Sequence, residues 1–559
     1  MKSAAFFCHF TMTLFCTQYD LIAYQLFPQH TLAMKWGIAV RIHKKTILYA
    51  AGVLACGNIA LQVLGFAYRV LLSHYAGAEG LGIYRLVNSI YLVCNAGCLS
   101  GVTMACSRLS AACEAKGERK KIRAILRLAF RVFLAMCVLC SAILLIWQQE
   151  ISENLLGDQR CARAFPFLLL CLGLTGIENI FKSLFIGLER MQYAAISEVA
   201  EQLIRIGAVW LLLSQYQGGD YGTIAMLIFC GMVASEIFSA SFLTILFRRG
   251  LAGSTPAAPL DNSTARQFFF IALPVSASAL LCNAISSAGS ILLPKRLMLA
   301  GLSYEQALSA LGVLSGMAMP LLLLPIALVS SVCTALLPAV TAAEAIGNHR
   351  RVCALTGRAI TTVGLIGVPA TAVLVPLAPA LSKRIFGQPL SMPYVSLLGI
   401  AVILCYYQMT AGSLLNALGL QHWQVFISVS AELCQVFLVY RLCASPTWGI
   451  YGYLLSMAFT EMLAFVASFM LLHRRLGFAL HPLRRFGVPI LCGGALYGWT
   501  SVFFTWFEQH SSSETASLIW TAVGAVALYL LVLRLMGIHL WQYLSRRIEK
   551  NTLPRLHLL

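Results

Sequence analysis

Long apolar stretches separated by short polar segments make up most of the chain. The apolar runs are about 20 residues long, the length at which a helix crosses a hydrocarbon layer of about 30 Å. A transmembrane barrel would instead show alternating segments of about ten residues, a pattern that this sequence lacks. We therefore expect an all-α polytopic membrane protein.

The apolar runs predict 14 transmembrane helices. They lie near residues 47–72, 83–110, 124–147, 163–187, 192–214, 221–247, 267–293, 307–338, 356–378, 393–416, 422–443, 450–472, 486–507 and 516–537. The segments between them are too short to fold as separate domains. We therefore expect the helix bundle itself to carry the function.

The amino-acid composition also indicates a membrane protein. Hydrophobic residues make up 59% of the chain and charged residues only 11%, whereas a soluble domain carries about 25% charged residues. The mean hydropathy is +0.80. This chain has too little polar surface to be coated by water.

Lysine and arginine gather in the segments on one side of the predicted bundle. They include Arg41, Lys44 and Lys45 before the first span, the cluster at 116–123, Arg350, Arg351, Arg474, Arg475, Arg546 and Arg547. Because cytoplasmic segments are enriched in Lys and Arg, we expect this side and both termini to be cytoplasmic. The net charge of +19 then faces anionic lipid head groups, and no nucleic-acid partner is expected.

Two short motifs occur twice, in the same order. "ACEAKGERKK" (112–121) matches "AAEAIGNHRR" (342–351), and "ISEVAEQ" (196–202) matches "ISVSAEL" (427–433), at offsets of 230 and 231 residues. An even number of spans separates the copies, so both halves have the same orientation in the membrane. The repeat predicts two pseudo-symmetric six-helix lobes around a central cavity, plus two extra C-terminal helices. This architecture is typical of transporters that open alternately to either side.

The repeat also divides the chain. We expect an N-terminal extension over 1–45, an N-lobe of spans 1–6 over 46–250, a C-lobe of spans 7–12 over 251–475, spans 13–14 over 476–540 and a cytoplasmic tail over 541–559. The extension is interrupted by polar residues and lacks a signal-peptide pattern. It is either disordered or the product of a start codon assigned too far upstream, with Met34 beginning a more ordinary start.

Signs of catalysis or metal binding are few. Most of the 19 cysteines lie inside apolar spans, where a cysteine behaves as a small hydrophobic residue. Cys137 and Cys140 have metal-site spacing, but no second pair or histidine lies near them in the sequence. A glycine-rich phosphate loop and an HExxH motif are also lacking. We expect neither an enzyme nor a cofactor or metal site.

Three segments carry a family resemblance: 64–91, which begins "LGFAYRVLLSHYAG", 189–206, "ERMQYAAISEVAEQLIRI", and 293–345, which contains "GMAMPLLLLP". They resemble the stage V sporulation protein B family, in the polysaccharide flippase branch of the multidrug/oligosaccharidyl-lipid/polysaccharide exporter superfamily. The resemblance extends over roughly residues 47–540 and includes similarity to peptidoglycan lipid II flippases. One departure is Gln62, at a position near "LGF" where the family often has a basic residue.

The resemblance implies a function. Such a protein flips a lipid II-like precursor, an undecaprenyl diphosphate sugar, across the bacterial plasma membrane by alternating access, for cell-wall or spore-cortex polysaccharide synthesis. Its partners would be the lipid-linked oligosaccharide, membrane lipids and cell-wall synthesis enzymes. The oligomeric state is left open.

Two other functions are weighed against this one. A multidrug or cation antiporter of the same superfamily would show a carboxylate in its first span, and span 1 has none. A membrane-embedded glycosyltransferase or polymerase would need a catalytic acid on a substantial extramembrane loop, which the sequence does not provide.

Charged residues inside spans are costly and therefore usually face a cavity or pair with one another. A diphosphate needs cations, and the candidates that lack an acidic residue four positions away are Arg69, Arg85, Lys295 and Arg296. The other explanation for Arg69 and Arg85 is that they extend to the membrane interface.

Four further charges form two i,i+4 pairs with the acid first, the favourable order. These are Glu178 with Lys182 and Glu201 with Arg205. They either line the cavity or neutralise each other and hold helices together.

Helix-breaking residues predict the moving parts. Pro274 lies in span 7, and Gly316, Pro320 and Pro325 lie in span 8. Proline removes a helical hydrogen bond and kinks the helix. The four positions are predicted hinges, with static kinks as the alternative.

Overall fold

The computed structural model describes residues 44–250, 261–477, 483–510 and 514–535. Almost all of these residues are helical, and none of them is in a strand. The predicted extension and the predicted tail lie outside the described residues, apart from the first two residues of the first helix. The all-α fold expected from the sequence is confirmed.

The helices follow one another in three runs. The first run is α3 (Lys44–Ala115), α4 (Arg119–Ile146), α5 (Gln148–Glu150), η1 (Ile151–Leu156), η2 (Gln159–Ala164), α6 (Phe165–Gly187), α7 (Met191–Gln215) and α8 (Tyr221–Gly250). The second is α9 (Asn262–Leu299), α10 (Tyr304–Gly312), η3 (Val313–Ala318), α11 (Met319–Leu322) and α12 (Ile326–Ala345). The third is α13 (His349–Phe386), α14 (Met392–Ala417), α15 (Gln421–Leu442), α16 (Gly449–Leu476), η4 (Leu483–Gly487), α17 (Val488–His510) and α18 (Glu514–Leu535).

Every predicted span falls on a helix. Within the described residues, 12 helices are long and apolar enough to cross a membrane. Helix α3 holds two of the predicted spans. Helix α7 holds another, although the charges at Glu198, Glu201 and Arg205 make it too polar to be counted among the twelve. Predicted span 8 corresponds to the interrupted helix from α10 to α12.

Helix α3 turns back on itself at one residue. Gly77 has φ of 61° and ψ of −173°, while the residues on both sides are helical. Positive φ is open to glycine without the steric cost that other residues meet. Spans 1 and 2 are therefore joined without a loop.

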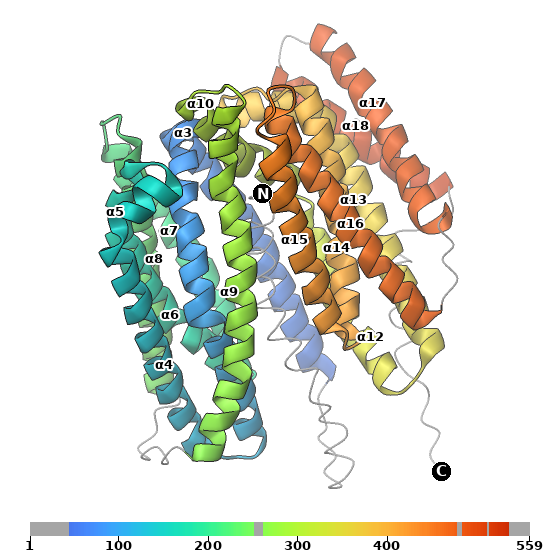
Figure 1. Cartoon of the computed structure of the whole chain (residues 1–559). Helices are drawn as coiled ribbons and strands as arrows, with labels where there is room; N and C mark the ends of the chain where they lie inside the picture. The colour runs from blue at the N-terminus through green and yellow to red at the C-terminus, as the bar shows by residue number, and fades with distance from the viewer. Residues whose placement is uncertain (1–43, 251–260, 478–482, 511–513, 536–559) are drawn as a thin grey trace, which may run out of the picture.

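The helices form two groups with α9 between them (Figure 1). Helices α6, α7 and α8 pack against α3 and one another, while α13, α14 and α16 pack on the other side of the molecule. Although α9 begins the second half of the chain, it packs mainly against α3, and to a smaller extent against α15. The last two helices lie outside both groups, with α17 and α18 against α13.

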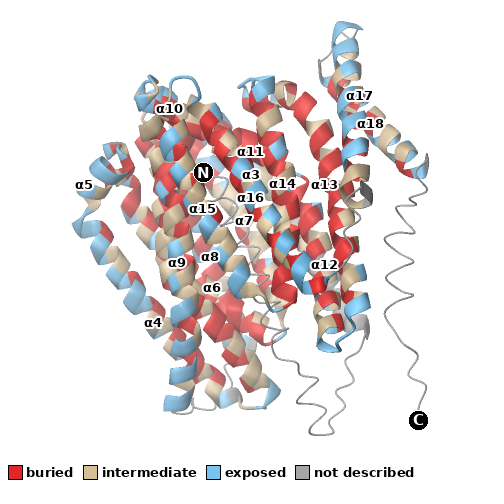
Figure 2. Ribbon diagram, turned by 45° about the vertical axis from the view of Figure 1, so that its right-hand side comes forward, coloured by how far each residue is buried: buried red, intermediate tan, exposed pale blue. Residues whose placement is uncertain are grey.

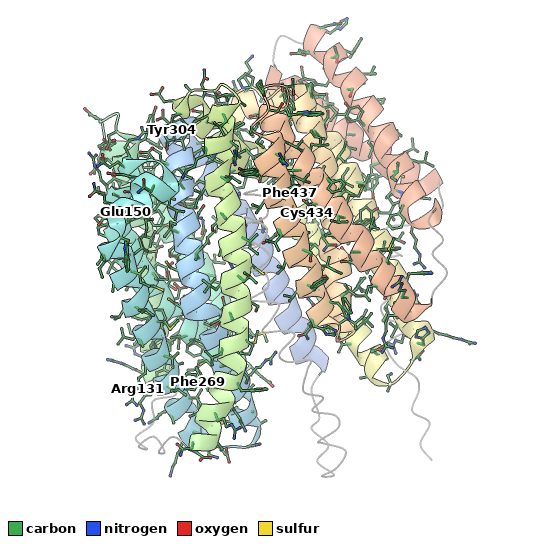
Figure 3. All side chains as sticks on the ribbon, viewed as in Figure 1. Arg131, Glu150, Phe269, Tyr304, Cys434 and Phe437 are labelled. Atoms are coloured by element: carbon green, nitrogen blue, oxygen red, sulfur yellow. The ribbon has the colours of Figure 1, made fainter. Side chains whose placement is uncertain are left out.

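The outer surface of the bundle is apolar. Buried residues concentrate where helices face one another, and exposed residues lie around the perimeter (Figure 2). Phe269 and Phe437 lie on this perimeter (Figure 3), and their exposed fractions are 40% and 59%. Phe270 reaches 82%. A surface of this kind is stable in lipid, where apolar side chains need no cover.

The repeated motif forms the same turn twice. Gly117 follows α3 with φ of 72°, and Gly347 follows α12 with φ of 65°. Gly117 N donates to Glu114 O at 3.0 Å, and Gly347 N donates to Glu344 O at 2.9 Å. Both turns lie at the lower end of the bundle in Figure 1. The two copies of the motif therefore reverse the chain in the same way at the same end.

Predicted span 8 is broken in its middle. A π-helical turn, η3, contains Gly316, and α11 contains Pro320. A turn then leads to Pro325, which caps α12. The hydroxyl of Tyr406 on α14 donates to the carbonyl of Leu322 at 3.1 Å. A neighbouring helix thus satisfies a carbonyl at the break, as an interruption within a membrane requires.

Candidate functional site

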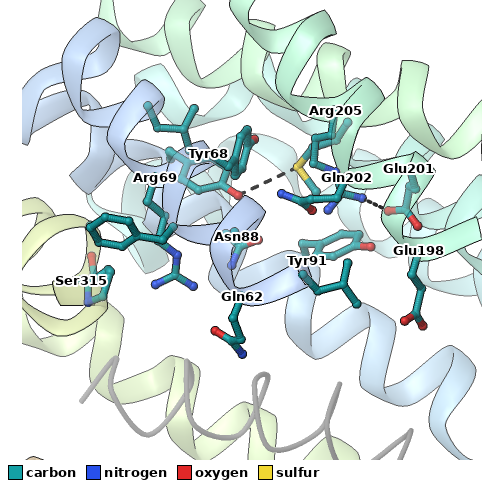
Figure 4. Close-up of a pocket in the computed structure, with 18 of the residues that line it drawn as sticks. Gln62, Tyr68, Arg69, Asn88, Tyr91, Glu198, Glu201, Gln202, Arg205 and Ser315 are labelled. Atoms are coloured by element: carbon teal, nitrogen blue, oxygen red, sulfur yellow. Dashed lines mark hydrogen bonds and ion pairs between the residues drawn. The ribbon is translucent and has the colours of Figure 1, made fainter. Parts of the chain in front are cut away.

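A cavity of about 440 Å³ lies between the two helix groups. Its lining comes from α3, α6, α7 and α8 on one side and from η3, α11, α12 and the turn between the last two on the other. Figure 4 shows it in close-up, with Arg69 on one side and Glu198 and Glu201 on the opposite side. The central cavity expected from the repeat is present.

Arg69 and Arg85 both line this cavity. Arg69 lies eight residues before Gly77 and Arg85 eight residues after it. With a helical rise of about 1.5 Å per residue, both lie about 12 Å from the turn. The hairpin therefore places the two guanidinium groups at the same depth, and they are close enough to interact electrostatically.

Lys295 and Arg296 lie elsewhere. Neither lines the cavity. Lys295 Nζ donates to the carbonyl of Asn154 at 2.7 Å, and the guanidinium of Arg296 lies 3.3 Å from the ring centre of Tyr440. The four cations predicted to act together are thus not brought together, because α9 carries the second pair beyond the cavity at its C-terminal end.

The two predicted ion pairs are present and belong to one larger network. Lys182 contacts Glu178 and also lies 3.2 Å from Glu201 and 3.7 Å from Glu198. Arg205 contacts Glu201. It also lies 3.1 Å from Glu236, on α8. The network joins α6, α7 and α8 and forms one wall of the cavity.

Part of this network resembles a cation site. One carboxylate oxygen each from Glu178, Glu201 and Glu236 lie within 4.8 Å of one another, and all three residues are buried. Oxygen ligands of this kind suit hard cations. However, the Lys182 ammonium and the Arg205 guanidinium already contact these carboxylates.

The predicted hinge residues fall into two places. Gly316 and Pro320 line the cavity. Pro325 ends the turn that follows α11 and caps α12. Pro274 lies inside α9. Near it, Ser276 Oγ accepts a hydrogen bond from the backbone N of Gly101, on α3, at 3.1 Å.

Sequence reasoning missed several polar residues of the lining. On α3 they follow a helical period, at Tyr84, Asn88, Tyr91 and Asn95. On α6 and α7 a helical spacing also joins the missed residues to the predicted ion pairs: Thr175 and Asn179 to Glu178 and Lys182, and Glu198 and Gln202 to Glu201 and Arg205. A polar stripe at i, i+3, i+4 and i+7 within an apolar span was the signal that would have found them.

Helices α3 and α10 pack closely against each other at one end of the molecule. A Cβ added to Gly312 would lie 1.8 Å from Ala78 O, and one added to Gly82 would lie 2.4 Å from Leu308 O. Beside this contact, the Tyr304 hydroxyl donates to Asp158 Oδ2 at 3.0 Å. Helices α3 and α10 therefore touch directly, backbone against backbone.

A second polar contact supports this packing. Arg160 lies 2.9 Å from both Asp158 and Glu79, the latter just after the turn of α3. Together with Tyr304, these residues connect α10, η2 and α3. Tyr304 lies at the upper end of the molecule in Figure 3.

Comparison with known proteins agrees with this geometry. A sequence profile of the family described as polysaccharide biosynthesis protein matches residues 47–344, more than half of the chain. The chain belongs to this family.

Two relatives match the chain over most of their lengths but are distant in sequence. Stage V sporulation protein B of Bacillus subtilis (strain 168) is 23% identical over 505 residues, which cover 88% of this chain and 95% of that protein. Lipid II flippase MurJ of the same strain is 23% identical over 528 residues, covering 86% and 94%. The resemblance predicted from the sequence is confirmed.

A solved structure shares the fold. A structure of lipid II flippase MurJ in an inward closed conformation aligns with a TM-score of 0.64 and 14% identity, over 89% of this chain and 99% of that one. The chain therefore shares its fold with a solved lipid II flippase, and these two sequence relatives are named as a sporulation protein and a flippase.

Proposed function

We propose that the protein moves a lipid-linked sugar diphosphate across the bacterial plasma membrane by alternating access. The observation that carries the proposal is the pair Arg69 and Arg85, held at one depth in a cavity between two helix groups. Lipid II flippase MurJ, a relative over most of the chain, is named for a substrate of this class.

The chemistry of the cavity suits both parts of such a head group. A guanidinium binds phosphate oxygens through two parallel hydrogen bonds, and its attraction for an anion is stronger in a low-dielectric cleft than in water. The amide and hydroxyl groups of Asn88, Asn95 and Tyr91 border the same space. They can hydrogen-bond to sugar hydroxyls while the polyprenyl tail stays in lipid.

The charge distribution supports an orientation. Arg119, Lys120 and Arg350 follow the repeated turns at the lower end, opposite to the closed α10 end. The positive-inside rule assigns the basic end to the cytoplasm. Both termini are then cytoplasmic, and the α3–α10 contact closes the cavity on the outer side.

Delivery and acceptance of the substrate follow from this orientation. Enzymes that build the lipid-linked sugar would supply it at the cytoplasmic side, and enzymes that polymerise cell-wall or spore-cortex polysaccharide would take it outside. The name of the relative stage V sporulation protein B is consistent with a spore-specific role.

A multidrug or cation antiporter is the second candidate, because four glutamates line the cavity. A cationic drug would bind to carboxylates. Here Lys182 and Arg205 contact all four of those carboxylates, which reduces the field available to a cationic drug.

Purified protein in liposomes tests the proposal. Undecaprenyl diphosphate linked to a fluorescent sugar is placed in the inner leaflet, and its appearance outside is followed with a membrane-impermeant quencher. We expect protein-dependent exposure of the diphosphate lipid, little exposure of a lipid without phosphate, and little activity in an Arg69→Ala/Arg85→Ala double variant. Uptake of cationic dyes without movement of the lipid would instead identify an antiporter.

A further inference from the structure

We infer that Glu178 and Glu236 share one exchangeable proton, and that this proton site in the cavity wall favours binding of an anionic head group. The second half of this inference rests on the proposed function. The first half does not.

The carboxylates of the wall outnumber their cations. Glu178, Glu198, Glu201 and Glu236 face only Lys182 and Arg205 within the network. If all were ionised, two negative charges would remain uncompensated there. Glu178 and Glu236 have exposed fractions of only 1% and 3%, and an uncompensated charge in such a place is strongly unfavourable.

Two buried carboxylate oxygens that lack a hydrogen-bond donor indicate where a proton can bind and reduce this charge. Oε2 of Glu178 and Oε2 of Glu236 are buried and accept no hydrogen bond from any donor in the described part of the chain. One carboxylate oxygen of Glu178 and one of Glu236 lie within 4.8 Å of each other. Two buried carboxylates this close strongly disfavour ionisation of both. A proton on one supplies the missing donor and compensates one of the two excess negative charges.

A metal ion fits this place less well. It would need a shell of several oxygen ligands, and it would lie next to two fixed cations. Lys182 Nζ is 3.2 Å from Glu201, and Arg205 Nη2 is 3.1 Å from Glu236. A proton needs no coordination shell and can bind between two carboxylate oxygens.

The charged and titratable surroundings come from all packed helices. They are Lys182 and Cys171 on α6, Glu198, Glu201 and Arg205 on α7, and Tyr91 on α3. Lys182 and Arg205 stay charged because each contacts at least two carboxylates. The groups of the cavity wall that gain or lose a proton are therefore the carboxyl groups.

The proton site and the arginines share the same cavity. A protonated wall is less negative and repels a diphosphate less. Binding of the anion and binding of the proton consequently favour each other, by the reciprocity of linked equilibria. The head group should bind more tightly as the pH falls, and its binding should take up a proton.

The first experiment measures the proton itself, by infrared spectroscopy of the purified full-length protein at neutral pH. We expect a carboxylic acid C=O band that disappears in Glu178→Gln and also in Glu236→Gln. The matched control is Glu508→Gln, which alters an exposed residue near the end of α17 and should retain the band. Two independent glutamine variants protect the test against misfolding of either one.

The second experiment uses inorganic pyrophosphate as the anionic probe. Its affinity for the wild-type protein should rise with falling pH more steeply than its affinity for the glutamine variants, by up to about tenfold per pH unit for one linked proton. The difference between the slopes cancels the titration of the probe.

The possible results distinguish the proton site from the diphosphate-binding cavity. An identical band in all proteins, or carboxylate bands that shift with sodium ions in place of a carboxylic acid band, would overturn the proton site. The expected band together with no pyrophosphate binding at any pH would support the proton site and contradict the diphosphate cavity.

Discussion

The consequence of losing a charged residue in this protein depends on how deeply its partners are buried. Lys182 has a side-chain exposure of 10% and contacts three glutamates. Arg163 has a side-chain exposure of 60% and contacts only Asp220 and Thr223 among the described residues. Removing a partner from a buried network leaves unpaired charge in a low dielectric, whereas water replaces an exposed partner.

We therefore expect Lys182→Met to destabilise the protein by about 3–5 kcal/mol. Thermal unfolding in detergent, followed by tryptophan fluorescence, measures the loss. Arg163→Ala is the control and should cost about 1 kcal/mol or less. Equal melting temperatures for the two variants would show that the network adds nothing to stability.

Loss of either cavity arginine should impair transport without unfolding the bundle. A hydrogen bond to a charged group contributes about 1.5–3 kcal/mol, so Arg69→Ala and Arg85→Ala should each slow flipping by about 10- to 100-fold. Lys383→Ala and Arg384→Ala alter exposed residues in the last turn of α13 and should be near wild type. Full activity of both cavity variants at matched membrane expression would remove the basis of the proposed function.

Among the elements, the contact between α3 and α10 is the proposed outer gate of the cavity. It depends on glycines that let two backbones approach, with Gly312 against Ala78 and Gly82 against Leu308. The interruption at η3 lies directly next to this contact, and Gly316 packs against Leu81. A change of state would therefore move α10 relative to α12 at the break.

Gly312→Ala should prevent this closure, because the new Cβ would lie 1.8 Å from a backbone oxygen. A cysteine placed at Ser315, in the cavity lining, should then react faster with a membrane-impermeant maleimide added from outside. Gly173→Ala is the matched control, since nothing lies within 4 Å of its added Cβ. Unchanged labelling in the Gly312 variant would show that this contact is not the outer gate.

For the whole molecule, the charge distribution predicts a single orientation. In intact cells, a cysteine introduced at Glu150 should be labelled by an impermeant maleimide, and one at Arg350 should be labelled only after the membrane is opened. Glu150 lies on the short α5, at the end of the bundle opposite the α12–α13 turn (Figure 3). The parent protein, with its own cysteines, gives the background. The reverse pattern would invert the orientation and the direction of transport.

The sequence predicted the helices well because length and apolarity alone determine a span. It also located the repeat, since Gly117 and Gly347 form identical turns. It could not place Lys295 and Arg296, because their position depends on where α9 ends relative to the cavity. Glu236 was overlooked for a similar reason. Its partner Arg205 lies on another helix, so the spacing of residues along one helix cannot predict this pair.

The join between the halves of α3 also affects how the chain enters the membrane. With Gly77 as the only irregular residue between two spans, no soluble connection exists that could cross first, so both halves insert together as a helical hairpin. Arg69 and Arg85 travel to the same depth during that step, and each adds about 2.5–3.5 kcal/mol to the insertion cost at the bilayer centre. The surrounding leucines and isoleucines of the hairpin have to offset both arginines at once. Every residue added at the turn would shift one arginine relative to the other by about 1.5 Å along the helix axis. The length of the turn at Gly77 therefore determines the relative depth of Arg69 and Arg85 as soon as the hairpin inserts.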